Sequence, residues 1–142
     1  MAIQNLKGFM NKLEKRLVKN PEKELKKLVQ RSTLLVEGTA KVSILDGGSG
    51  ITYQKYNPRR QHTASAPGEA PASDTGFLVS NITSNVKKEG TAIVGQIVAS
   101  APYSPYLEFG TSTIEPRPFM QPALERNRPA IKRIFKSGDY ID

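Results

Sequence analysis

The chain has 142 residues, a net charge of +8 at pH 7 and a mean hydropathy of −0.44, which fits one ordinary domain with a modest core. The chain has no cysteine, which excludes disulfides and thiolate metal sites. No apolar run reaches the roughly 18 residues that a membrane-spanning helix needs, so we expect no membrane partner.

The positive charge is concentrated at the N-terminal side. Residues 1–41 carry ten Lys or Arg and four Glu, a net +6, whereas residues 42–142 carry eleven and nine, a net +2. Such a basic region suits nucleic acid, an anionic membrane or an acidic protein surface, and it equally suits a solvated helix face.

The first third of the chain is predicted to be helical. Apolar residues recur every three or four positions from residue 3 to about residue 42, which predicts one long amphipathic helix or a kinked pair. Asn20, Pro21 and Glu22 are typical of a helix start within this stretch. The Gly-rich segment 46–50 then ends the helix in a turn.

The middle of the chain is predicted to be mostly loop. Residues 51–56 alternate weakly and predict one short strand, whereas 57–74 holds three prolines and no apolar side chain larger than alanine. We therefore expect 57–74 to be a long exposed loop or arm, locally basic at Arg59 and Arg60. His62, the only histidine, is expected to be exposed and unspecialised.

The last part of the chain predicts two strands and two helices. Residues 77–86 and 91–100 favour two β-strands around a tight turn with Glu89 and Gly90 at its tip. A short helical turn should follow at 103–109, and a last helix at about 118–135 should be kinked or split by Pro129. That helix is expected to bury one apolar face, made of Met120, Leu124, Ile131, Ile134 and Phe135.

The predicted fold class is therefore α+β, with a long N-terminal helix, a small antiparallel sheet with a hairpin, and a C-terminal helix. We expect residues 1–142 to form a single domain in three stretches: a helical region at 1–45, a Pro/Gly-rich arm or loop at 46–75, and the hairpin with the last helix at 76–142.

Three features suggest catalysis, and each has a simpler explanation. The glycines at 46–50 lack the preceding strand and following Gly-Lys-Ser/Thr of a phosphate-binding loop. Asp74-Thr75-Gly76 matches the triplet of aspartic proteases, but Pro71-Ala-Ser73 precedes it where those enzymes have an apolar strand. We expect Asp74 to cap a turn that Gly76 permits. His62 lies in a polar loop with no nearby carboxylate cluster, so no catalytic, cofactor-binding or metal-binding residue is predicted and the chain is not expected to be an enzyme.

The segment 101–125 is the most specific part of the chain. It holds five of the ten prolines, and it contains Tyr106-Leu-Glu-Phe-Gly-Thr111 followed by Arg117-Pro-Phe119 and Pro122-Ala-Leu124. Upstream stand His62-Thr-Ala-Ser-Ala-Pro-Gly-Glu-Ala-Pro71 and Asp74-Thr-Gly-Phe-Leu78. In this order the motifs resemble the head–tail joining, neck or tail-completion proteins of long-tailed phages, over about residues 60–135.

The resemblance implies a structural subunit of the virion, assembled in the host cytoplasm as a homo-oligomeric ring at the neck or tail end. Its neighbours would be the phage connector or head-closure protein and the tail terminator or tail-tube protein, with contact to passing DNA. No cofactor and no substrate are implied. The candidate partner-contacting residues are Arg59, Arg60, Tyr103, Tyr106, Glu108, Phe109 and Arg117.

Two alternatives remain open from the residues themselves. The aromatic side chains of 103–109 suit interface anchors, and they equally suit packing of that turn onto the sheet. The alternative function is a nucleic-acid-binding module that acts through the lysine-rich face of residues 7–31, in a manner that depends strongly on salt.

Overall fold

The structure is a computed structural model that describes residue 11 and residues 20–137. The helix expected at 3–19 lies outside the described residues except for Asn11. The α+β class is confirmed, with two small antiparallel sheets rather than one. The elements in chain order are α2 (Pro21–Leu45), β1 (Thr52–Tyr56), β2 (Arg59–Thr63), α3 (Phe77–Ser80), β3 (Ile82–Glu89), β4 (Ala92–Ala99), α4 (Ser104–Phe109) and α5 (Met120–Ser137).

The helix α2 begins where the sequence predicts. Asn20 is the N-cap and Pro21 the first helical residue, although the Asn20 side chain makes no capping hydrogen bond. Glu22 pairs with Lys26 one turn later, at 3.4 Å, as their spacing indicates. The helix ends at Leu45, where the backbone N–H of Asp46 donates to the carbonyl of Val42 at 2.9 Å.

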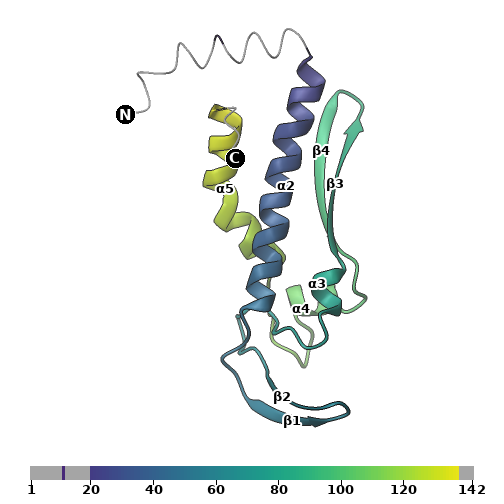
Figure 1. The fold of residues 1–142 in the computed structure, drawn as a ribbon, viewed down its shortest axis with the longest axis vertical. Helices are drawn as coiled ribbons and strands as arrows, with labels where there is room; N and C mark the ends of the chain where they lie inside the picture. Colours follow the sequence, from purple (N-terminus) through teal and green to yellow (C-terminus); the bar gives the residue numbers. More distant parts are fainter. Residues whose placement is uncertain (1–10, 12–19, 138–142) are drawn as a thin grey trace, which may run out of the picture.

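α2 is the centre of the molecule, with α5 on one side and the β3–β4 hairpin on the other (Figure 1). A Cβ at Gly95 would overlap the side chains of Val29 and Thr33, so glycine lets β4 approach the helix closely. On the other side, Nδ2 of Asn127 donates to Oγ1 of Thr39 at 2.8 Å and ties α5 to α2.

The buried apolar side chains form two clusters along α2. One cluster lies at the C-terminal end of the helix and joins it to α3, β3 and α5: Ile44, Leu78, Ile82, Ala101 and Phe119. The other lies further up between α2 and α5: Val36, Ala40 and Ala123. The largest fully buried side chains, Phe119, Ile44 and Ile82, all belong to the first cluster, which therefore holds the end of the molecule that carries the loops.

The predicted C-terminal hairpin is confirmed from residue 82 onward but is wrong at its start. β3 and β4 pair from Ile82–Ala99 to Glu89–Ala92, and Gly90 has the positive φ of 59° that a tight turn needs. Residues 77–80 are a helical turn, α3, and not a strand. Gly76, with φ 77°, turns the chain into this helix, and Leu78 is buried in the core beneath it.

Two further predictions need correction. Part of the expected loop at 57–74 is the strand β2, which pairs with β1 in a second hairpin. Pro129 does not split the last helix, since α5 continues through it, and the ribbon of α5 bends along its length, in keeping with the expected kink (Figure 1). Leu124 and Phe135 are exposed on this helix, because its buried face is instead the one bearing Ala123, Asn127 and Ile134.

Candidate partner interface

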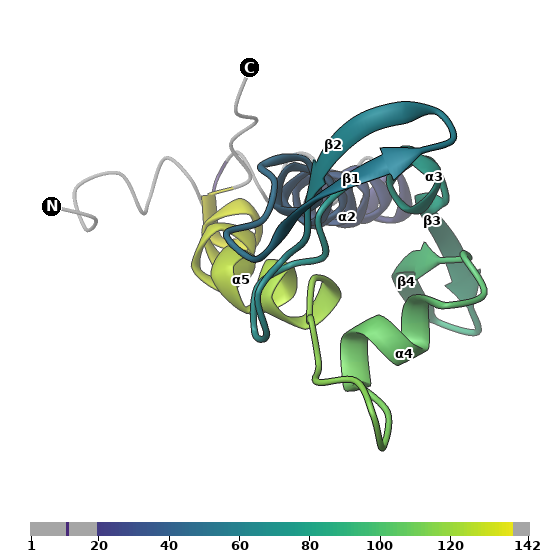
Figure 2. The same cartoon turned by 90° about the horizontal axis from the view of Figure 1, so that it is seen from below.

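The β1–β2 hairpin, α3, α4 and residues 110–119 lie at the end of the molecule where α2 ends, and we call this end the foot. The β1–β2 hairpin, residues 51–64, extends there apart from the β3–β4 hairpin, and we call it the arm (Figures 1 and 2). Its register pairs Tyr53 with His62, Lys55 with Arg60 and Tyr56 with Arg59. Since side chains alternate along a strand, the first two pairs share one face and the Tyr56–Arg59 pair lies on the other.

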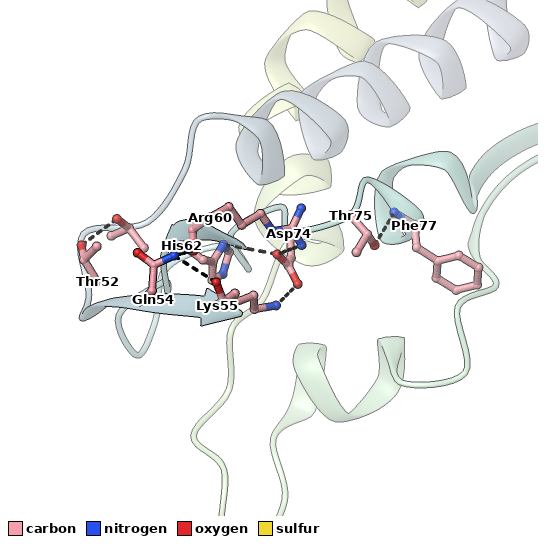
Figure 3. A network of polar contacts seen from close by, with 9 residues as sticks. Thr52, Gln54, Lys55, Arg60, His62, Asp74, Thr75 and Phe77 are labelled. Carbon is pink, nitrogen blue, oxygen red and sulfur yellow. Dashed lines mark hydrogen bonds and ion pairs between the residues drawn. The ribbon is translucent and has the colours of Figure 1, made fainter. Parts of the chain in front are cut away.

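The inner face of the arm is held by Asp74. Lys55 and Arg60 are directly opposite on the two strands, an arrangement of like charges that is unfavourable by itself. The Asp74 carboxylate accepts a hydrogen bond from each of them, with Arg60 at 2.5 Å (Figure 3). The Lys55 hydrogen bond, helped by the charge of Arg60, lowers the pKa of Asp74. Arg60 is thus engaged within the chain.

His62 is not exposed, contrary to the prediction. Its side chain is 13% accessible, and its ring meets Tyr53 edge-on at 5.5 Å. Nδ1 of His62 lies 3.7 Å from Oδ1 of Asp74. The turn at 74–76 is capped by Thr75, whose Oγ1 accepts from the N–H of Phe77 at 3.3 Å, whereas the Asp74 side chain turns to the arm. The pairing across β1–β2 places His62 against Tyr53, which the sequence alone did not show.

The base of the arm is fixed by polar contacts. Glu69 accepts hydrogen bonds from the hydroxyl and the N–H of Ser49 and from the N–H of Ala66. The Ser49 hydroxyl and the two amides lower the pKa of Glu69 to about 2. Arg117 donates from Nε and from its terminal nitrogen to the carbonyl of Ser65, at 3.3 Å each. The arm is therefore held in one position by bonds to distant parts of the chain.

The outer face of the arm presents the exposed cross-strand pair Tyr56 and Arg59, for which the structure shows no side-chain bond to another described residue. Tyr56 is 81% exposed next to its cross-strand partner Arg59, which is also exposed. Ile51, at the beginning of the arm, is 80% exposed. Tyrosine and arginine are among the residues that most often dominate the binding energy of protein interfaces.

A second set of exposed side chains lies on α3 and α4, and we call it the aromatic surface. It consists of Phe77, Tyr103, Tyr106 and Phe109. Phe77 and Tyr103 contact each other, with ring centres 6.2 Å apart, while Phe109 is 75% exposed. Figure 2 shows α4 and the loop after it protruding from the rest of the molecule. Tyr106 and Phe109 are thus not buried by packing of the 103–109 turn onto the sheet.

Glu108 has a role that the sequence analysis missed. Its carboxylate accepts hydrogen bonds from the backbone N–H groups of Phe119, Met120 and Gln121, at 2.9 to 3.0 Å. These are the first amides of α5, which have no partner within the helix. One sequence signal could have indicated this role. No Ser, Thr, Asp or Asn stands directly before Met120, so the first amides of the helix need a hydrogen-bond acceptor from elsewhere in the chain.

A cleft of about 370 Å³ separates the arm from α4. It is lined by Tyr53, His62, Asp74, Phe77, Tyr103 and Arg117, among others. Both oxygens of Asp74 are engaged by cations, which does not fit a general base or a proton-sharing pair of aspartates. Within residues 20–137, no group of three or more His, Asp or Glu side chains is arranged to hold a metal ion. Among the described helices, none is long and apolar enough to span a membrane.

Of the predicted contact residues, the structure thus leaves Arg59, Tyr103, Tyr106 and Phe109 exposed at the foot of the molecule. Arg60, Glu108 and Arg117 instead bind other parts of the chain. All seven belong to the arm, to α4 or to the segment that leads into α5.

Comparison with known proteins finds a family model that matches part of the chain. Residues 59–110 match the model of the family described as "Bacteriophage HK97-gp10, putative tail-component". The matched segment runs from the first residue of β2 to the residue after α4, so it contains the second strand of the arm and the whole aromatic surface. No curated protein and no solved structure matches the chain. The resemblance to a phage neck or tail-component family is confirmed over this segment, and the match supports a structural phage protein.

Proposed function

We propose that the chain is a structural subunit of a phage tail that assembles as a ring at the head–tail joint and joins the tail to the capsid connector. The family match over residues 59–110 supports a tail component. The observation that favours self-assembly is that two surfaces are exposed at the foot of the molecule: the outer face of the arm and the aromatic surface.

A closed ring needs two different surfaces on each subunit, because every subunit meets one neighbour with each of them. The arm and the aromatic surface belong to different elements and differ in shape, since one is a protruding hairpin and the other a helical surface. We therefore propose that Tyr56 and Arg59 of one subunit contact the aromatic surface of the next. The connector or head-closure protein and the tail terminator or tail-tube protein would then bind the assembled ring.

The rigid support of both surfaces favours this arrangement. The arm is held by Asp74, Glu69 and Arg117, and α4 is joined to α5 through Glu108. A surface that is already ordered loses less conformational entropy on binding than a mobile loop. The arm therefore presents Tyr56 in a defined position rather than as a flexible tail.

The test is the mass of the assembly in solution, measured by light scattering and native mass spectrometry. We expect the wild type to form a ring whose mass is a multiple of 15.6 kDa. Tyr56→Gln and Phe109→Gln should each weaken assembly by about tenfold or more, since truncation of an interface anchor costs on the order of 2 kcal/mol. The matched control is Leu34→Gln, which removes a 53% exposed apolar side chain from α2 and should leave assembly unchanged.

Two outcomes would contradict the proposal. One is a wild type that stays monomeric at all concentrations and is absent from purified phage particles. The other is a Leu34→Gln variant that loses assembly as much as the variants of Tyr56 and Phe109.

A further inference from the structure

One end of the molecule carries the net positive charge of the described residues. The start of α2, the β3–β4 turn and the last turns of α5 all lie at the end opposite to the arm (Figure 1). We call residues 22–31, 87–89 and 128–136 the basic end. They carry ten Lys or Arg and three Glu, a net +7, whereas the other described residues carry six and seven, a net −1. The charge is therefore separated along the long axis.

The carboxylates of the basic end are too few to neutralise its cations. Glu22 is shared by two of them, Lys26 at 3.4 Å and Lys88 at 2.8 Å. Lys132 and Lys136, both exposed on α5, make no ion pair with any described residue. A local excess of exposed cations produces a positive potential that attracts anions over about 8 Å at physiological salt.

Part of this charge forms a row along α5. Arg128, Lys132 and Lys136 follow one another at four-residue spacing on α5, so they share one face of the helix. At 1.5 Å per residue, the row is about 12 Å long. Duplex DNA carries one negative charge per about 1.7 Å of its axis, so a row of this length faces several phosphates.

We propose that the basic end binds the phosphate backbone of double-stranded DNA. Seven of its ten cations are lysines, which are depleted in protein–protein interfaces and common in contacts with phosphate. Its one aromatic residue is Phe135, which does not make the row of stacking rings that binds single strands. The chemistry therefore favours a duplex over an acidic protein surface or a single strand.

This inference goes beyond the proposed tail function, because a single subunit is sufficient for binding. It also differs from the sequence-based alternative, which placed nucleic-acid binding on the lysines of residues 7–31. In the structure, α5 and the β3–β4 turn supply six of the ten cations of the basic end.

The experiment is the binding of a fluorescent 30-base-pair duplex, followed by anisotropy between 50 and 300 mM KCl. The affinity should fall steeply with salt, with a slope of about −0.9 in log–log form per phosphate contacted. The Lys132→Gln/Lys136→Gln variant should bind about threefold to tenfold more weakly per cation removed and should reduce the slope by about 2.

The matched pair is Lys132→Glu and Arg59→Glu, which change the net charge equally at opposite ends of the molecule. We expect Lys132→Glu to lose most of the binding and Arg59→Glu to keep it, with both variants folded by circular dichroism. Equal loss in both, or binding that does not depend on salt, would overturn the proposal. So would displacement of the duplex by polyglutamate at the same charge concentration, which would indicate an acidic protein partner. The mass of the Lys132→Glu assembly should be unchanged, so this test and that of ring formation can fail separately.

Discussion

The body and the foot of the molecule are held together in different ways. The body, made of α2, the β3–β4 hairpin and α5, is joined by apolar side chains packed along α2. The foot, made of the arm, α3, α4 and residues 110–119, is attached to the body by the buried Phe119. Its own parts are joined by the carboxylates of Asp74 and Glu108, which bind cations or backbone amides. Stability therefore comes mainly from apolar packing around α2, including that of Phe119, while polar bonds set the positions of the exposed arm and aromatic surface.

Two phenylalanines of the foot, ten positions apart, give the sharpest test of which side chains are packed and which are free for a partner. Phe119 is 1% exposed in the first core cluster, whereas Phe109 is 75% exposed on the aromatic surface. Phe119→Ala should lower the free energy of unfolding by about 3–5 kcal/mol, and Phe109→Ala by less than about 0.5 kcal/mol. Urea unfolding of the two variants measures both values, and equal losses would contradict the assignment of Phe109 to a partner surface.

The Glu108 cap should give the next largest effect. Glu108→Ala leaves three amides at the start of α5 without an acceptor, so we expect a loss of about 2 kcal/mol of unfolding free energy. Glu108→Gln keeps one acceptor oxygen and should lose less. Glu115→Ala, at an exposed carboxylate in the same region, is the control and should be neutral. A neutral Glu108→Ala would show that this cap is dispensable.

Asp74→Asn should affect the arm and little else. The substitution removes the negative charge between Lys55 and Arg60, whose repulsion then destabilises the arm. Since these side chains are about a third exposed and solvent screens their interaction, the global loss of stability should be small. Hydrogen exchange should speed up for amides of residues 52–63 and stay unchanged in α2. Asp46→Asn, at an exposed carboxylate, serves as the control.

The smallest effect concerns pH. The pKa of Glu69 is lowered from its ordinary 4.5 to about 2, so its bonds contribute fully above pH 4.5 and are lost as the pH falls toward 2. The lowered pKa of Asp74 has the same sign. The amide signal of Ser49, followed by NMR, should therefore change in this acid range, and Glu69→Gln should abolish that step. A Ser49 amide that titrates near pH 4.5 would contradict the bonds at the base of the arm.

The body was predictable from the sequence because its signals are local. Asn20 and Pro21 mark the start of α2, and the β-branched residues of β4 with Gly90 before them mark the second hairpin. The element just before this hairpin, α3 of the foot, was not predicted: Phe77-Leu-Val79 favoured a strand, although Gly76 and the burial of Leu78 produce a helical turn.

The foot could be predicted only in part, because its contacts join residues far apart in the sequence. β2 has no apolar alternation, and what holds it is Asp74, fourteen residues after Arg60. Glu108 reaches across eleven to thirteen residues to cap α5. The exposed aromatic residues were predicted as contacts from their types, but their exposure depends on how α4 lies on the body.

The most direct test of the account is hydrogen exchange on the assembled form, isolated by sedimentation, compared with monomeric Phe109→Gln protein. We predict that assembly slows exchange in residues 51–63 and 103–114 and leaves the exposed stretch of α2 around Leu34 unchanged. Slower exchange confined to α2, with the arm and α4 unaffected, would contradict the claim that the foot makes the contacts between subunits.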